Sequence, residues 1–109
     1  MPRWTIRLAL KADQDMAEII AWTAEHFGSR QAMMYAETLT LALEALFDGP
    51  GTIGARRRDD IQPGVSLLHV ARQGRRGRHF IVFRPGKGHV IEVLRILHDS
   101  MDISRYLDG

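Results

Sequence analysis

Apolar and polar side chains alternate with a period of two over residues 3–9, RWTIRLA. Trp4, Ile6 and Leu8 share one face of this pattern, and charged or hydroxyl side chains occupy the other. Such alternation with β-branched residues is typical of a strand that buries one face. We therefore predict a first strand here, with Trp4 packed in the core.

Residues 13–28, DQDMAEIIAWTAEHFG, have the spacing of an amphipathic helix. The apolar stripe recurs every three or four positions and consists of Met16, Ile19, Ile20, Thr23 and Phe27. Asp13 or Asp15 can cap the N-terminus, and Asp15 with Glu18 three positions later forms a capping-box pattern. Gly28 is typical of the residue that follows a helix. These signals predict a helix that starts around Asp13 to Asp15 and stops at Gly28.

Residues 29–49, SRQAMMYAETLTLALEALFDG, predict a second helix with Ser29 as its N-cap. Its inward face repeats every three or four positions and consists of Ala32, Ala36, Leu39, Leu43, Leu46 and Phe47. Further apolar side chains widen this surface: Met33, Met34, Tyr35 and Leu41. Two helices joined by a Gly-Ser break form an antiparallel hairpin. The surplus apolar surface suits a sheet on one side or a partner protein on another.

The second half of the chain predicts β structure. Residues 48–64 contain four glycines and two prolines and predict a loop. Residues 65–72, 78–84 and 89–97 predict three strands, joined by the short connectors QGRRG and PGKG of antiparallel hairpins. The last strand is apolar on both faces, so we expect it to be central and covered on both sides. The order is β-α-α-β-β-β, an α+β fold in which a helical hairpin packs on a small, antiparallel-rich sheet; we expect residues 1–109 to form one domain.

Composition is that of an ordinary globular protein, with 45% hydrophobic and 26% charged residues in 109. There is no cysteine, which excludes structural disulfides and thiolate metal sites. The first residues carry no continuous apolar segment, and no stretch approaches the roughly 18 apolar residues of a membrane span. We expect a soluble, cytoplasmic protein that has no contact with membranes.

Charge is unevenly distributed along the chain. Residues 1–48 contain four Lys/Arg and seven Asp/Glu, a net −3, whereas residues 49–109 contain eleven and six, a net +5. Ten of those eleven cations are arginines, which pair bidentately with carboxylates or phosphates. This excess fits an acidic partner such as nucleic acid or an acidic peptide, and equally a solvated basic surface. Within it, the run 56–58 is followed at once by Asp59 and Asp60, which favours local ion pairs.

Common catalytic and phosphate-binding motifs are absent: there is no GxGxxG, P-loop, HExxH or GxSxG. The five histidines lack paired ligand spacing, so we predict neither a metal nor a cofactor. What remains is a set of cations and proton-carrying groups on the predicted sheet and tail: Arg72, Arg78, Arg84, Arg95, His98 and Tyr106. Metal-independent RNA cleavage needs a base, an acid and cations around the phosphorane, and such residues can supply them.

Four segments resemble the RelE/ParE superfamily of bacterial toxins: DMAEIIAWTAEHFG, IQPGVSLLHV, FIVFRPGKG and VIEVLRILHDSMD. The resemblance covers nearly the whole chain, although IQPG stands where the family favours RPG and the loop GPGTIGARRRDD is longer than its counterpart. The terminal strand followed by LHDSMD is similar to the ParE branch, whose members pair with ParD antitoxins. The resemblance therefore implies the toxin of a type II toxin–antitoxin system.

Two mechanisms are implied by that resemblance. RelE-type members cut mRNA in the ribosomal A site with a face rich in lysine and arginine, whereas ParE-type members poison DNA gyrase. This chain has only Lys11 and Lys87, and His98 is followed by Asp99 instead of the adjacent tyrosine of some RelE-type relatives. We therefore favour a non-enzymatic gyrase poison. The alternatives are an mRNA endonuclease, with Arg84, Arg95, His98 and Tyr106 as its catalytic set, and a non-enzymatic or decayed interaction module.

The implied partners give expectations for the binding sites. A ParD-like antitoxin has a DNA-binding dimeric N-terminal part and a disordered C-terminal segment that folds on the toxin, so DNA is contacted only through the antitoxin in a hetero-oligomer. Candidate antitoxin contacts are the apolar residues of the helical hairpin, Trp22, Met33, Met34 and Tyr35. Candidate target contacts are Arg84, Arg95, His98 and Arg105. For Arg95 and His98 the residues also suggest structural roles: pairing with a carboxylate, and holding the strand end to the tail.

Overall fold

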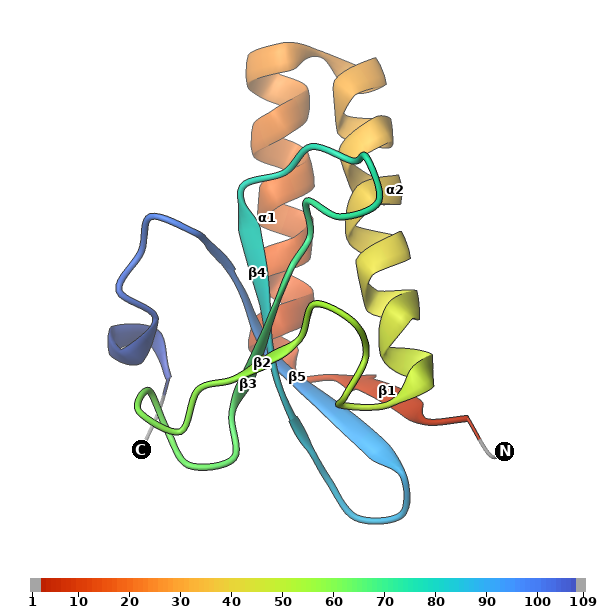
Figure 1. The fold of residues 1–109 in the computed structure, drawn as a ribbon. Coiled ribbons are helices and arrows are strands. Elements are labelled where there is room, and N and C mark those ends of the chain that lie inside the picture. Colours follow the sequence, from red (N-terminus) through yellow and green to blue (C-terminus); the bar gives the residue numbers. More distant parts are fainter. Residues whose placement is uncertain (1–2, 108–109) are drawn as a thin grey trace.

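The computed structural model describes residues 3–107 (Figure 1). Its helices and strands, in chain order, are β1 (Thr5–Leu8), α1 (Leu10–Phe27), α2 (Ser29–Ala45), the 3-10 turn η1 (Leu46–Asp48), β2 (Arg56–Arg57), β3 (Ser66–His69), β4 (His79–Pro85), β5 (Val90–His98) and the 3-10 turn η2 (Ile103–Tyr106). The predicted α+β order is confirmed, with one strand added in the loop that precedes β3.

The strands form one mixed sheet in the order β1-β5-β4-β3-β2. β1 pairs in parallel with β5, and the remaining pairs are antiparallel. β5 is therefore an interior strand, as expected, although the middle strand of the five is β4. The prediction that residues 48–64 lack a strand is wrong, because β2 pairs with the outer edge of β3.

Apolar side chains cover the sheet on both faces. The larger cluster lies between the sheet and the helices and includes Leu39, Phe83 and Ile91, all fully buried. The smaller cluster lies on the opposite face, where Ile103 of the C-terminal tail packs with Val82. The expectation that β5 is covered on both sides is confirmed for residues 94–97, because Ile96 belongs to the larger cluster and Leu94 and Leu97 to the smaller one. At Glu92 only the side toward the helices is covered.

The predicted helix caps are wrong. α1 begins at Leu10 with Ala9 as its N-cap, and α2 begins at Ser29 with Gly28 as its N-cap; neither cap makes a side-chain hydrogen bond. The chain enters α1 directly from the sheet, because the Ala9 N–H donates to the carbonyl of Val93 at 2.9 Å. The expected end of α1 at Gly28 is confirmed, and the φ of Gly28 is +91°.

The alternating pattern of the first strand is confirmed, since Trp4, Ile6 and Leu8 are half-buried against the larger cluster. The Trp4 ring lies 4.6 Å from that of His89. Gly49, at φ +106°, lies so close to Trp4 that an added Cβ would fall 2.8 Å from the indole Nε1. In the part of the chain that the structure describes, no helix is long and apolar enough to cross a membrane.

Candidate functional site: a groove with a polar floor

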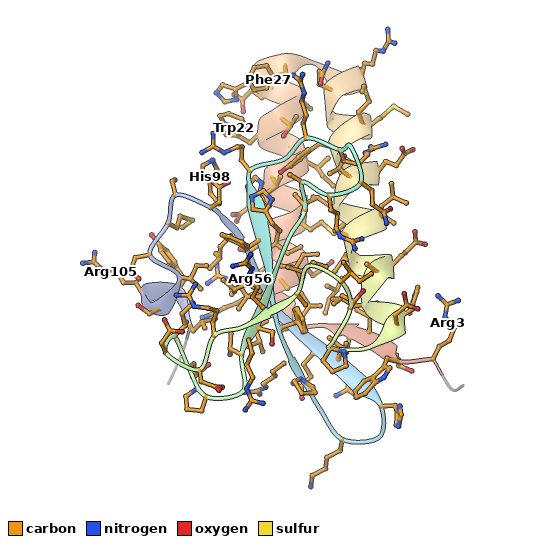
Figure 2. The ribbon with its side chains drawn as sticks, viewed as in Figure 1. Arg3, Trp22, Phe27, Arg56, His98 and Arg105 are labelled. Atoms are coloured by element: carbon orange, nitrogen blue, oxygen red, sulfur yellow. The ribbon has the colours of Figure 1, made fainter. Side chains whose placement is uncertain are left out.

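A groove of about 1170 Å³ runs between the helical hairpin and the end of the sheet. It is lined by one face of α1, by α2, by the 74–79 loop, by residues 95–98 of β5 and by Met101 and Tyr106 of the tail. Figure 2 shows Trp22 and Phe27 near the tip of the helical hairpin, with His98 toward the same end of the molecule. Segments distant in sequence thus share one concave surface.

The groove exists because β1 is shorter than β5. β1 pairs with β5 only as far as Val93, so the upper part of β5 has no neighbouring strand on that edge. The carboxylate of Asp15 fills this place: its Oδ2 accepts the Ile96 N–H at 2.9 Å. A carboxylate on α1 therefore satisfies a backbone donor that another strand would otherwise satisfy.

Arg95 forms a bidentate ion pair with the same carboxylate. Its Nε donates to Asp15 Oδ2 and its Nη2 to Oδ1, both at 2.8 Å, and the two side chains are only 18% and 11% exposed. Its Nη1 donates to the carbonyl of Tyr106 at 3.0 Å, which holds the tail against the sheet. The expectation that Arg95 pairs with a carboxylate is confirmed, and this pairing uses the fork geometry of arginine.

Exposed apolar side chains form the upper lip of the groove. Trp22 is 54% exposed and stacks on His26 at 4.1 Å, and Phe27 is 63% exposed with its edge toward Trp22. Met34, on α2, is 52% exposed and also lines the groove. These apolar side chains stay exposed to water unless a partner occupies the groove.

The floor of the groove contains hydrogen-bonded polar side chains. The Arg78 N–H donates to the hydroxyl of Tyr35 at 3.0 Å, and that hydroxyl lies 2.6 Å from Nδ1 of His79. Burial, reinforced by the neighbouring His98, lowers the pKa of His79 to about 4. At neutral pH His79 is therefore uncharged, and its Nδ1 accepts the hydroxyl proton of Tyr35. Burial is also the main cause of the raised pKa of Tyr35.

Asp99 joins the end of β5 to two other segments. It accepts hydrogen bonds from the guanidinium of Arg78 and from Nε2 of His69, the latter at 2.9 Å. His69 Nδ1 accepts the Ala71 N–H, so the ring proton is on Nε2 and points to the carboxylate. The hydrogen bonds from Arg78 and His69 hold the pKa of Asp99 at about 2, so it is a carboxylate at neutral pH.

His98 makes the contact with the tail that its position suggested. Its Nδ1 accepts the Ser100 N–H at 3.1 Å and lies 2.7 Å from the Ser100 hydroxyl. Its ring also lies 5.3 Å from that of His79, edge to face. His98 therefore belongs to the floor of the groove and to the turn that starts the tail.

Arg75 fixes the 74–79 loop to α2. Its guanidinium donates to the Thr38 hydroxyl at 2.9 Å, to Glu37 Oε1 at 2.7 Å and to the carbonyl of Met34 at 3.0 Å. Gly77 lets the loop approach Val70 and Tyr35, because a Cβ there would lie 2.5 Å from Val70 Cγ2 and 3.1 Å from the Tyr35 hydroxyl. Sequence reasoning missed Arg75, Tyr35 as a floor residue and His79; the only local signal was the pair of glycines in QGRRG.

The structure distributes the candidate residues over several places. Trp22, Met34, Tyr35, Arg95, His98 and Tyr106 line the groove. Met33, 74% exposed, lies in an adjoining shallow depression of α2. Arg84 and Arg105 lie outside the groove lining: Arg84 is 3.7 Å from Glu92, and Arg105 is 3.4 Å from Asp102. The four residues of the possible nuclease set are thus not assembled, because Arg84 is apart from the other three.

Two further expectations concern charge and metals. The local ion pairs expected after residues 56–58 are confirmed, since Arg57 binds Asp59 and Arg58 binds Asp60. Within residues 3–107, no three histidine or carboxylate side chains are placed to hold a metal ion.

Comparisons with known proteins agree on one family. The family model described as the ParE toxin of the type II toxin–antitoxin system parDE matches residues 6–103. The chain is 30% identical to Toxin ParE1 of Caulobacter vibrioides over 101 residues, which is 93% of this chain and 95% of that protein. It is 32% identical to Toxin ParE1 of Mycobacterium tuberculosis over 100 residues, which is 92% of this chain and 94% of that protein.

Solved structures share the fold. One is the chromosomal ParDE toxin–antitoxin system of P. aeruginosa, with a TM-score of 0.72 and 21% identity, covering 90% of this chain and 98% of that one. Another is the toxin–antitoxin complex RelBE2 of Mycobacterium tuberculosis, with a TM-score of 0.55 and 15% identity, covering 88% and 98%. Both have the arrangement of two helices on a small mixed sheet described above.

Proposed function

Because this chain belongs to the family of ParE toxins of type II toxin–antitoxin systems, we propose that it arrests growth by poisoning DNA gyrase and is neutralised by a ParD-like antitoxin bound in the groove. It acts by binding and not by catalysis. The proposal that an antitoxin binds here rests on the groove itself, whose lip exposes the apolar side chains of Trp22, Phe27 and Met34.

The chemistry of the groove fits an amphipathic segment of another protein. Large exposed aromatic and methionine side chains are typical anchors of protein interfaces. Below them, Arg75, Arg78 and Arg95 are each already paired with a carboxylate, so the floor offers polar contacts but little free charge. A segment that is disordered when free can fold into this groove with its apolar face on the lip.

The antitoxin part is tested by substitution at the lip. Trp22→Ala should weaken binding of the antitoxin's C-terminal segment by about 2 kcal/mol, roughly thirtyfold in Kd, because a central aromatic anchor is removed. Leu41→Ala is the matched control, since Leu41 is an exposed apolar residue of α2 outside the groove lining. Titration calorimetry compares the two variants. An equal loss for both, or none for Trp22→Ala, contradicts a binding site at the groove.

The gyrase part is supported by family membership and by the separation of Arg84 from the other members of the possible nuclease set. Its test is a supercoiling and DNA-cleavage assay with purified gyrase. We expect loss of supercoiling and accumulation of cleaved DNA as toxin is added. Unaffected gyrase at toxin concentrations that stop growth would refute this part and leave the antitoxin part standing.

A ribosome-dependent mRNA endonuclease is the second candidate, and the polar floor is the observation that favours it. Tyr35, His79 and His98 lie together beside Arg78, so a neutral imidazole, a hydroxyl and a cation meet on one surface. This candidate predicts cleaved mRNA in arrested cells, and loss of cleavage in His98→Ala with the fold retained. Intact mRNA in cells arrested by the wild-type protein excludes it.

A decayed toxin, reduced to an interaction module, is distinguished from both candidates by expression without antitoxin. Folded protein that accumulates harmlessly indicates the decayed form. Growth arrest indicates an active toxin, whichever of the two targets it has.

A further inference from the structure

The end of the molecule opposite the groove has a different chemistry. In Figure 1 the α1–α2 connection and the β4–β5 hairpin lie at opposite ends of the molecule. The strand register places Arg7 and Arg84 directly opposite Glu92, one on each side of it. Paired residues of neighbouring strands point to the same face of a sheet. Arg7, Glu92 and Arg84 therefore form one row across β1, β5 and β4.

That row lies on the sheet face opposite the helices. Ile91 and Val93, the neighbours of Glu92, pack in the cluster beneath the helices, so Glu92 points the other way. Arg7 and Arg84 are exposed there, and the Arg84 side chain retains 47% of its accessible surface. The row therefore faces solvent.

One further cation extends the row toward the hairpin. Lys87 is exposed between Gly86 and Gly88 at the hairpin tip. Arg3 does not belong to this surface, because its guanidinium sits 4.7 Å above the ring of Phe47, in the turn that follows α2. We define the basic end as Arg7, Arg84 and Lys87.

The charge of the basic end is only partly compensated. Glu92 lies 3.7 Å from Arg84, and an added Cβ on Gly86 would fall 2.9 Å from its Oε1, so this carboxylate lies against Arg84 and the hairpin and its side chain is 34% exposed. Among residues 3–107, no carboxylate forms an ion pair with Arg7 or Lys87. These cations are available to an external anion.

The basic end lacks the anchors of a protein interface. The large exposed apolar side chains of residues 3–107 all lie outside β1, β4, β5 and the β4–β5 hairpin. Protein interfaces depend on such anchors, whereas contacts to a phosphate backbone need only cations and hydrogen-bond donors. Trp4, which precedes β1, is half-buried against His89 and Gly49, so its ring offers no open face on which a single-stranded base could stack.

We propose that the basic end binds the phosphodiester backbone of duplex DNA without reading its sequence. Its cations are carried by a twisted sheet face and a glycine-flanked tip, which can follow a phosphate backbone. The expectation that DNA is contacted only through the antitoxin would then be too narrow. The proposal goes beyond gyrase poisoning and does not depend on it, although it would place the toxin on the DNA that gyrase holds.

The test is the anisotropy of a short fluorescent DNA duplex titrated with the purified full chain at several salt concentrations. For about three phosphate contacts, the logarithm of the binding constant should fall with the logarithm of the salt concentration with a slope of about −2.7. Arg7→Ala/Lys87→Ala should reduce the steepness by about two units and weaken binding roughly tenfold or more. Both residues are exposed, so thermal unfolding should be unchanged.

The control is Arg30→Ala/Arg105→Ala, which removes the same charge from exposed arginines away from the basic end. It should leave both affinity and salt slope close to wild type. No salt-dependent binding at low salt overturns the proposal, as does an equal loss in the control. A poly-glutamate peptide or a single strand bound more tightly than the duplex also overturns it. Because gyrase is absent from the assay, failure here leaves the proposed gyrase target untouched.

Discussion

Asp15 is the residue on which the groove wall depends most directly. Its carboxylate accepts two hydrogen bonds from Arg95 and one from the Ile96 N–H, in a place where both side chains of the ion pair are largely buried. Removing one member of such a pair leaves an uncompensated charge in a poorly solvated site. Since Arg95 also holds the carbonyl of Tyr106, the tail depends on the same pair.

We predict that Asp15→Asn lowers the free energy of unfolding by about 3 kcal/mol, because the shape is kept but the charge that balances Arg95 is lost. Denaturant titration measures the effect. Asp13→Asn is the control, since Asp13 is an exposed acidic residue in the first turn of the same helix. A loss no greater than in Asp13→Asn would mean that the pair is unimportant for stability.

Asp15 also illustrates what single residues disclose before a structure is known. The capping-box pattern with Glu18 is a local signal, and it predicts Asp15 at a helix start. The backbone bond from Ala9 to Val93 instead starts α1 at Leu10, which moves Asp15 into the second turn. The sequence predicts a carboxylate partner for Arg95, but the identity of that partner depends on the packing of α1 on β5, which no local pattern specifies.

At the scale of elements, the 74–79 loop connects the two halves of the fold. Arg75 donates from three guanidinium nitrogens to α2, reaching a hydroxyl, a carboxylate and a carbonyl. A planar fork in this position immobilises the loop over the floor of the groove. The loop carries Arg78 to the Tyr35 hydroxyl, so its position also orders the floor.

Arg75→Lys should therefore loosen the loop while leaving the sheet and helices folded. A lysine ammonium cannot reproduce the fork, so we expect a global loss of about 1 kcal/mol and faster amide exchange over residues 73–78. Hydrogen exchange read by mass spectrometry measures this directly. Arg76→Lys is the matched control, because Arg76 is exposed and its side chain makes none of these contacts with α2. Unchanged exchange in Arg75→Lys would show that the loop is held by other contacts.

Elements with a clear hydrophobic period could be predicted from the sequence, and one without it could not. Both helices and the four longer strands follow from periods of 3.6 and two. β2 consists of Arg56 and Arg57, and it is a strand only because the edge of β3 offers hydrogen-bonding groups to it. A charged dipeptide carries no sign of such non-local pairing, so the sequence alone predicts a loop there.

At the scale of the whole molecule, the polar floor makes stability depend on pH. His79 on β4, Tyr35 on α2 and His98 on β5 meet there. Asp99, which follows β5, binds His69 and the floor residue Arg78. The folded state lowers the pKa of His79 from 6.5 to about 4, so the unfolded chain binds more protons between these values. The contribution of neutral His79 to the free energy of unfolding is fully present above pH 6.5 and is lost as the pH decreases toward 4. Asp99, lowered from 3.8 to about 2, acts in the same direction below pH 3.8.

We predict that the free energy of unfolding decreases by about 1 kcal/mol between pH 6.5 and pH 4 because of His79. This value is smaller than the full pKa shift implies, because the His79 ring is partly solvated. His79→Gln keeps an acceptor for the Tyr35 hydroxyl but cannot take up the proton, so it should flatten the pH dependence in this range. His89→Asn, at the exposed β4–β5 hairpin, should retain it. Urea titrations at several pH values measure the slopes, and parallel slopes for His79→Gln and wild type would assign the effect to other groups.

The two ends of the molecule differ in chemistry: the groove exposes apolar side chains, and the basic end exposes cations. The amino-acid composition and the net charge do not show this division. The sequence predicts surplus apolar surface on the second helix, and Met34 of that surface lines the groove. The arginines of the second half are not gathered at the basic end, since Arg75, Arg76, Arg78 and Arg95 line the groove. The two surfaces lie apart because β5 runs from the basic end at Val90 to the groove at His98. One strand thus connects two surfaces that are proposed to bind different kinds of partner.

If both proposals hold, antitoxin and DNA should bind the chain independently. A partner in the groove and a phosphate backbone at the basic end share no contact residue, so the coupling free energy between them should be near zero. Anisotropy of labelled duplex with and without a saturating C-terminal antitoxin segment should give dissociation constants within about twofold. The isolated segment is used because the DNA-binding part of an antitoxin would bind the duplex itself. Trp22→Ala should weaken only the segment, and Arg7→Ala/Lys87→Ala only the DNA. Displacement of DNA by the segment would instead place the two sites on one surface.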